Sequence, residues 1–511
     1  MPAGAAALGL GLVNAASFST AHGWWLQIVA LAALLALLAT PHPRPMARAA
    51  ITGFVFGLAS FCAGVGWLYI SMHRYGGLAA PLAAAAVVLL SAYLALFGAL
   101  ALALAQCLAP AGRPGAGATL ARIGALAACW MLGELARGWL FTGFPWLSLG
   151  YAQVDGPLVK IAAGIGVYGL GGTVVAIAAA LATLWRLRNH DAGATLLATG
   201  VTGAAAVCLA GFGGSASIEP SGPAVTVRLL QGNVEQGMKF DPQRARRAMN
   251  DYTDDVLAGN ALLTVLPETA WTTTWRGTPP AVSERLFAHL ARSGGFVAIG
   301  LPERAPDPAG GAAGMLSNSV VVRGPDGEPV GRYDKRQLVP FGEYIPPAFG
   351  WFVRMMNIPL GEFARGADRQ PPVRIGGQDF AFDICYEDLF PGLLREQVRD
   401  GASVLVNISN IAWFGDSHAL GQHLNISRLR AIELGRPMLR ATNTGMTASI
   451  DASGRVLAAL EPVTRGALDI EVRGAAGLTP YVRFGHWPAT GIAAFFLLAL
   501  AARRRREARK S

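Results

Sequence analysis

Long apolar runs separated by short polar breaks fill the chain from residue 3 to residue 213. Most of them approach the roughly 20 residues needed to cross about 30 Å of hydrocarbon, so they predict membrane-spanning helices. The predicted spans are residues 3–19, 24–40, 50–71, 80–108, 119–141, 160–185 and 194–213. The first two are poorly separated, and a shallow hairpin is an alternative interpretation of that stretch.

The pattern changes after residue 214, where shorter alternating runs and turn signals appear. These runs predict strands at residues 225–230, 262–266, 296–301, 319–323, 380–384, 404–408 and 438–442, with turns at 325–327 and 451–454. Helical periodicity predicts helices at residues 242–258, 281–293, 388–398 and 418–434. Strands that alternate with helices in this way indicate an α/β domain with a covered sheet.

A last apolar run near the C-terminus predicts an eighth span and completes the domain organisation. The predicted parts are a membrane domain at 1–214, an α/β domain at 220–475, a C-terminal span at 486–502 and a basic tail at 503–511.

Composition supports a membrane protein. Hydrophobic residues make up 53% of the 511 residues and charged residues 14%, whereas soluble domains carry roughly 25% charged residues. The net charge of +10 lies largely in short clusters beside apolar runs, so the sequence does not predict a nucleic-acid-binding face.

The basic clusters predict a topology. They lie at residues 42–48, 113–122 and 185–188, after the second, fourth and sixth spans, and again at 503–506. Because basic loops stay in the cytoplasm, all four clusters place the region between about 215 and 485 on the other side of the membrane.

Cys385 is the first candidate for chemistry, since it lies between a predicted strand and a predicted helix. A helix N-terminus or a nearby cation can lower the pKa of such a thiol below its free value of about 8.5. A structural buried thiol is the alternative. The remaining cysteines all lie in apolar runs, where cysteine usually acts as a small hydrophobe: Cys62, Cys107, Cys129 and Cys208.

Two charged residues, Glu268 and Lys335, also follow short apolar or alternating runs. Taken singly, a glutamate after a strand is usually a residue of the first turn of a helix, and a lysine in a polar loop is usually solvated. Together with Cys385 they resemble the Glu-Lys-Cys triad of the nitrilase superfamily.

The whole chain resembles one membrane-bound family of that superfamily, the apolipoprotein N-acyltransferases. The resemblance rests on the membrane half and on motifs at residues 142–146, 231–233, 267–268, 333–335, 340–343 and 385–387. It implies a multi-span α-helical membrane domain followed by an extracytoplasmic nitrilase-like αββα sandwich.

The resemblance also implies roles for the site residues. Glu268 would be the general base, Cys385 the nucleophile, and Lys335 the cation that stabilises the oxyanion. Further residues match functional positions of the family: Glu343, Tyr386, Glu387, Trp413, Phe414 and Glu433. Glu343 and Glu387 are expected to keep Lys335 charged and to orient the site, with structural ion pairing as the alternative. For the aromatic pair at 413 and 414 the alternative is core packing.

Two positions depart from the family pattern. Ile411 stands where an aspartate is common, and Phe240 follows Lys239 where a tryptophan is frequent. The first departure puts a loop hydrogen bond in question, while the second keeps an aromatic surface.

An apolar stretch at 349–360 suggests a lipid-contacting loop or a lid, or alternatively a small buried helix. Its candidate lipid-binding residues are Trp351, Phe352, Met355 and Met356.

The resemblance implies a ping-pong acyl transfer. Cys385 would take an acyl chain from a phospholipid, with phosphatidylethanolamine expected, and pass it to the α-amine of a diacylglyceryl-cysteine apolipoprotein. No cofactor or metal is expected, since His418 and His423 lie off one helical face. We expect a monomer in the bacterial inner membrane with its catalytic domain in the periplasm.

Two other functions remain open at this point. A membrane-tethered amidase or nitrilase would use the same triad on a small C–N substrate, but it would not explain the apolar loop or the seven spans. The other is a transporter or binding protein. Ionisable residues within the spans would mark a transport path, but the spans contain few of them. Glu134 and Arg137 are the exceptions, and they lie near the end of one span.

Overall fold

A computed structural model describes residues 2–111, 115–185, 192–235, 242–306, 314–346, 350 and 362–509. The chain forms two compact units. One comprises Met1–Gly66, Ala84–Ala216 and Thr479–Ser511, and the other comprises Trp67–Ala83 and Ser217–Leu478. A short segment between two membrane helices therefore belongs to the second unit, which the sequence did not predict.

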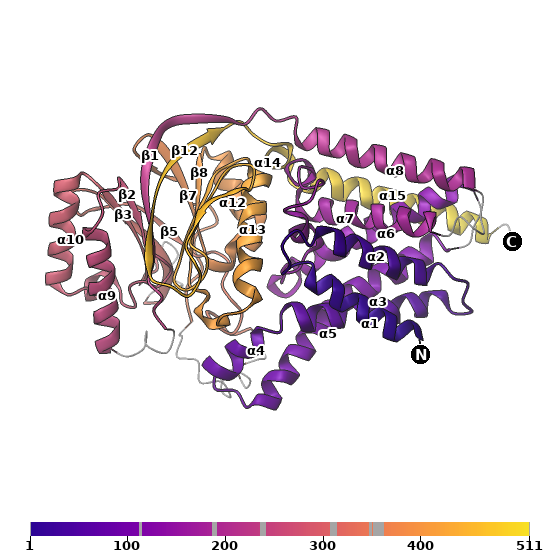
Figure 1. Ribbon diagram of the computed structural model, residues 1–511, viewed down its shortest axis with the longest axis horizontal. Helices are drawn as coiled ribbons and strands as arrows, with labels where there is room; N and C mark the ends of the chain where they lie inside the picture. Colours follow the sequence, from indigo (N-terminus) through magenta and orange to yellow (C-terminus); the bar gives the residue numbers. More distant parts are fainter. Residues whose placement is uncertain are drawn as a thin grey trace. The chain divides into compact units, whose positions relative to one another are not determined.

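The first unit is helical (Figure 1). Among the residues that the structure describes, five helices of this unit are long and apolar enough to cross a membrane: α3 (Pro45–Gly64), α5 (Ala80–Leu108), α6 (Ala116–Arg137), α7 (Ile161–Leu184) and α8 (Ala192–Gly213). Two shorter apolar helices precede them, α1 (Pro2–Ala16) and α2 (Trp24–Leu38), with 15 residues each. Their shortness agrees with the shallow-hairpin interpretation of the first 40 residues.

Several helix ends differ from the predicted boundaries. The third span was expected to reach residue 71, but α3 ends at Gly64, and the short helices α4 (Leu68–Ile70) and η1 (Ser71–Tyr75) follow it. The last helix, α15 (Trp487–Ala508), continues through the basic cluster at 503–506, so the first residues of the predicted basic tail are helical. Arginine is a good helix former, so the charges of this cluster do not end the helix.

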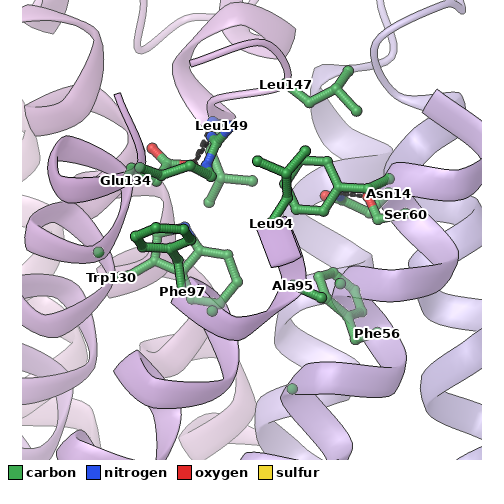
Figure 2. Close-up of a pocket in the computed structure, with 16 residues that line it drawn as sticks. Asn14, Phe56, Ser60, Leu94, Ala95, Phe97, Trp130, Glu134, Leu147 and Leu149 are labelled. Atoms are coloured by element: carbon green, nitrogen blue, oxygen red, sulfur yellow. Dashed lines mark hydrogen bonds and ion pairs between the residues drawn. The ribbon is translucent and has the colours of Figure 1, made fainter. Parts of the chain in front are cut away.

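Glu134 and Arg137, the ionisable pair at the end of α6, fix the loop that follows. Arg137 Nη1 donates to the carbonyl oxygens of Phe144 and Trp146, each at 2.7 Å. Glu134 Oε1 accepts from the backbone N–H of Leu149 at 2.9 Å, beside a cavity of about 40 Å³ (Figure 2). This structural use of both charges weakens the transporter alternative.

The second unit contains two six-stranded sheets. The first has the order β12 (Gly466–Ala476), β1 (Glu219–Gln231), β2 (Leu263–Val265), β3 (Phe296–Arg304), β4 (Leu316–Arg323) and β5 (Pro329–Asp334). The second has the order β11 (Val456–Ala459), β10 (Ala448–Ile450), β9 (Met438–Thr442), β8 (Val404–Ser409), β7 (Gln378–Ile384) and β6 (Val373–Ile375). Strands β1, β2 and β3 are parallel, as are β7, β8 and β9, while the other neighbours are antiparallel.

Helices cover the outer face of each sheet (Figure 1). Helices α9 (Pro242–Leu257) and α10 (Pro280–Ser293) lie on the first sheet, where Tyr252, Trp271 and Leu286 are fully or almost fully buried in a hydrophobic core. Helices α12 (Pro391–Arg399) and α13 (His418–Leu434) lie on the second sheet. The two sheets face each other between these helix layers, so the predicted αββα architecture is confirmed.

The segment after Cys385 differs from the predicted helix at 388–398. A 3₁₀ turn, η7 (Cys385–Leu389), comes first, and α12 begins only at Pro391. Proline favours the first turn of a helix because its missing N–H would be unpaired there anyway. Cys385 therefore lies on a tight elbow and not at the N-terminus of the long helix.

Candidate active site

Three strand ends bring the predicted triad together. Glu268 follows β2, Lys335 follows β5 directly, and Cys385 follows β7 directly. The exposed fractions of these residues are 6%, 1% and 9%, in the same order. Three polar groups buried at one place need partners, because an unpaired charge in the interior is strongly disfavoured.

Lys335 is paired with two carboxylates. Its Nζ donates to Glu268 Oε1 at 3.1 Å and to Glu343 Oε1 at 2.9 Å. Burial alone would lower the pKa of Lys335, but the two glutamates outweigh it and hold that pKa well above its usual value. Lys335 is therefore a fixed cation.

Asn318, on β4, joins the two carboxylates and was not predicted from the sequence. Its Nδ2 donates to Glu268 Oε1 and to Glu343 Oε1, each at 2.7 Å. Glu343 Oε2 also accepts from the backbone N–H of Val339 at 2.8 Å. The only sequence signal was an asparagine beside a predicted strand, which does not reveal partners so distant in the chain.

Glu268 is held on both oxygens, since Oε2 accepts from the backbone N–H of Asn410 at 2.8 Å. Burial by itself would raise the pKa of Glu268. Lys335 and the hydrogen bonds from Asn318 and Asn410 outweigh burial and hold that pKa below its usual value. Glu268 is thus ionised at neutral pH and can accept a proton.

Cys385 adopts a positive φ of 58°, a conformation that non-glycine residues rarely adopt. Burial is the largest cause that raises the pKa of its thiol, Glu268 raises it further, and Lys335 opposes both. The sequence predicted a lowered pKa for this thiol, but the fold raises it, so Cys385 rests as a thiol and not as a thiolate. Such a thiol needs a base at the moment of attack.

Glu387 ties the lysine segment to the cysteine strand. Its carboxylate accepts from the backbone N–H groups of Arg336 at 2.7 Å, Gln337 at 2.9 Å and Ile384 at 2.8 Å. It also accepts from the hydroxyl of Tyr333 at 3.0 Å. These four bonds fix the spacing between the strand ends of Lys335 and Cys385. Its neighbour Tyr386 is buried and packs edge-on against Phe390, with ring centroids 5.0 Å apart.

Trp413 and Phe414 pack on the segment inserted between α3 and α5. The ring centroids of Phe414 and Trp67 lie 4.1 Å apart, and those of Trp413 and Tyr75 lie 5.9 Å apart. Trp67 Nε1 also donates to Gln422 Oε1 at 3.2 Å. These aromatic residues therefore support the turn η8 (Ile411–Phe414), which follows Asn410 directly. Because Asn410 donates to Glu268, this packing also supports the carboxylate.

The remaining candidates lie elsewhere. Glu433, on α13, forms a fully buried ion pair with Arg430. Ile411, the departure from the family pattern, is 1% exposed and would collide with a side chain at Gly445. Two predictions fall outside the described residues. One is the proposed lipid loop with Trp351, Phe352, Met355 and Met356, and the other is the departure at Phe240. Within the described ranges, no group of three or more His, Cys, Asp or Glu side chains could hold a metal ion.

Comparison with known families identifies the chain. Residues 10–180 match the apolipoprotein N-acyltransferase N-terminal domain, and residues 226–481 match the carbon-nitrogen hydrolase family. An apolipoprotein N-acyltransferase from Ralstonia nicotianae is 45% identical over 97% of this chain and 92% of its own. The chain belongs to the apolipoprotein N-acyltransferase family. A second member of this family, from Bordetella bronchiseptica, is 44% identical over 94% of this chain and 92% of its own.

Among the solved structures that are similar to this chain is an amidase of the nitrilase superfamily from Nesterenkonia AN1. It is 21% identical and covers 52% of this chain and 95% of its own, with a TM-score of 0.37. Family membership makes this chain an acyltransferase, and the αββα unit is its carbon-nitrogen hydrolase domain.

Proposed function

We propose that this protein transfers a fatty acyl chain from a phospholipid to the N-terminal α-amine of a diacylglyceryl-cysteine lipoprotein, through a thioester on Cys385. The observation that carries the proposal is a buried thiol, on Cys385, that interacts electrostatically with both the ionised Glu268 carboxylate and the Lys335 ammonium group. The names of its relatives, apolipoprotein N-acyltransferases, supply the acceptor class.

The first half-reaction opens the phospholipid ester. The Cys385 sulfur attacks the ester carbonyl carbon while its proton passes to Glu268. Lys335 stabilises the negative charge on the carbonyl oxygen, in a site where burial strengthens charge interactions. When the C–O bond breaks, Glu268 returns the proton to the departing alkoxide, which leaves as a lysophospholipid. The acyl chain stays on sulfur.

The second half-reaction forms the amide. The neutral α-amine of the lipoprotein attacks the thioester carbon, Glu268 takes a proton from the amine nitrogen, and Lys335 again stabilises the oxyanion. When the C–S bond breaks, the proton passes from Glu268 to sulfur and regenerates the thiol. A thioester is more readily attacked by an amine than an oxygen ester is, so two easier steps replace one difficult step.

The predicted topology explains why a membrane lipid serves as the donor. The four basic clusters support an orientation with the catalytic unit outside the cytoplasm, where neither acyl-coenzyme A nor ATP would be available. Under this proposal the protein acts in the bacterial inner membrane, with its catalytic unit in the periplasm, as a monomer. Phosphatidylethanolamine is the proposed donor.

The test is a transfer assay in detergent with phosphatidylethanolamine and a synthetic diacylglyceryl-cysteine peptide. We expect one acyl chain to appear in amide linkage on the peptide, and a peptide with an acetylated N-terminus to remain unmodified. Hydrolysis of small amides without acylation of either peptide would contradict the proposal and favour a membrane-tethered amidase.

A further inference from the structure

A fully buried polar cluster lies behind Cys385 and has no part in the two half-reactions. Asp388 from η7, His423 and Ser427 from α13, and Arg440 from β9 all have exposed fractions of 0%. Three of these groups can carry a charge, and they come from three separate elements. Buried charges are retained only where they are paired, so the hydrogen bonds of the cluster show what it holds in place.

The hydrogen bonds fix the tautomer of His423. Arg440 Nη2 lies 3.1 Å from His423 Nδ1, and a guanidinium can only donate, so Nδ1 must carry the lone pair. Nε2 therefore carries the hydrogen. Burial is also the main cause that lowers the pKa of His423, which favours the same neutral ring.

The hydrogen on Nε2 faces two acceptors. Nε2 lies 2.9 Å from Asp388 Oδ1 and 3.3 Å from the carbonyl oxygen of Cys385. Asp388 is in turn held by Arg440, whose Nη1 donates to Oδ2 at 3.1 Å, and by the hydroxyl of Ser427. The ion pair thus fixes the ring, and the ring reaches the backbone of the nucleophile.

A second donor meets the same carbonyl oxygen. Asn407, on β8, donates from Nδ2 to the Cys385 oxygen at 2.9 Å. Cys385 has a positive φ, and such a conformation persists only when its surroundings enforce it. Two buried side chains from different elements, His423 and Asn407, therefore hold the carbonyl oxygen of Cys385.

This restraint has a consequence for the peptide between Cys385 and Tyr386. In a trans peptide the N–H points away from the carbonyl oxygen of the same plane. Holding the oxygen in the buried cluster therefore turns the N–H of Tyr386 away from the cluster. There it can serve beside Lys335 as a donor to the oxyanion, and such donors act only when they are oriented in advance.

We propose that His423 is a positioning residue for acyl transfer: as the Nε2–H tautomer fixed by Arg440 and Asp388, it holds the Cys385 carbonyl and so orients the Cys385–Tyr386 peptide. The proposal rests on Cys385 being the nucleophile, as in the proposed function. His423 itself exchanges no proton with the substrate.

The test compares two reactions of Cys385 in the full-length protein. Acylation by p-nitrophenyl butyrate passes through an oxyanion, whereas alkylation by iodoacetamide does not. In His423→Leu we expect the acylation rate to fall about 100-fold, because misplacing a catalytic group by about 1 Å typically lowers the rate by that factor. The alkylation rate should change by less than about fivefold. In His423→Gln, whose amide can donate from nearly the same position, acylation should recover to within about tenfold of wild type.

Gln397→Leu is the matched control. Gln397 is buried on α12 and donates from Nε2 to the carbonyl oxygen of Phe382 at 2.8 Å, in the strand that leads to Cys385. It should lose stability as His423→Leu does, without a change in the ratio of acylation to alkylation. Equal losses of acylation and alkylation in His423→Leu, or no recovery in His423→Gln, would overturn the proposal.

Both reagents are soluble and need no lipid. If the wild-type protein accepts no chain from any phospholipid, the proposed lipid transfer fails, while the ratio of the two rates still tests the role of His423.

Discussion

Glu268→Gln is expected to slow acylation of Cys385 by about 10³-fold at neutral pH, within the range by which general bases contribute. The amide keeps the size of the side chain and can still accept from the Asn410 N–H, but it cannot take the thiol proton. Since the pKa of that thiol is raised by burial, almost no thiolate is present without the base. Release of p-nitrophenolate from an activated ester measures the rate.

The pH dependence separates this mechanism from a preformed thiolate. The pKa of Glu268 lies below its usual value of about 4.3, so the wild-type rate should be flat from about pH 5 to pH 9 and fall only in stronger acid. In Glu268→Gln the rate should instead rise about tenfold per pH unit, because only the thiolate reacts. A wild-type rate that rises through about pH 8.5 would contradict the assignment of Glu268 as base.

Lys335→Met is expected to lower acylation by about 10²- to 10³-fold, the usual effect of removing one oxyanion donor. It also leaves the carboxylates of Glu268 and Glu343 without the cation that lies 3.1 and 2.9 Å from them. Breaking a buried pair in this way typically costs about 3–5 kcal/mol of unfolding free energy. The burst rate and a thermal melt measure the two effects separately.

The double variant Lys335→Met/Glu343→Gln is the matched control. Neutralising Glu343 removes one of the two unpaired charges, so stability should recover in part. Activity should stay at the level of the single variant, because the oxyanion still lacks its cation. Recovery of activity together with stability would mean that Lys335 acts only through folding.

Some elements were predictable because one local pattern determines them. Helix α13 and strand β9 have the predicted bounds, since Ser417 caps the start of the helix, the left-handed Gly435 ends it, and the strand begins soon afterwards. Strand β12, of 11 residues, was not predicted. The short strands β6, β10 and β11, of three or four residues each, were not predicted either. So few residues show no clear alternation, and their pairing with neighbouring strands defines them.

The positions of the three proposed catalytic residues at strand ends could be predicted, whereas the residues around them could not. The order of Glu268, Lys335 and Cys385 at strand ends came from a family resemblance. Asn318 lies 50 residues from Glu268 in the chain, and Trp67 lies 355 residues from Gln422, so no local pattern joins them. The pKa of Cys385 depends on burial and on the Glu268 charge, which only the folded arrangement supplies.

The most direct test of the thioester is the intact mass of the detergent-purified protein after incubation with phosphatidylethanolamine and no amine acceptor. We expect the wild type to gain the mass of one fatty acyl chain, to lose it on treatment with hydroxylamine, and Cys385→Ala to gain nothing. An equal gain in Cys385→Ala, or no gain in the wild type with any of several phospholipids, would contradict acyl transfer through Cys385.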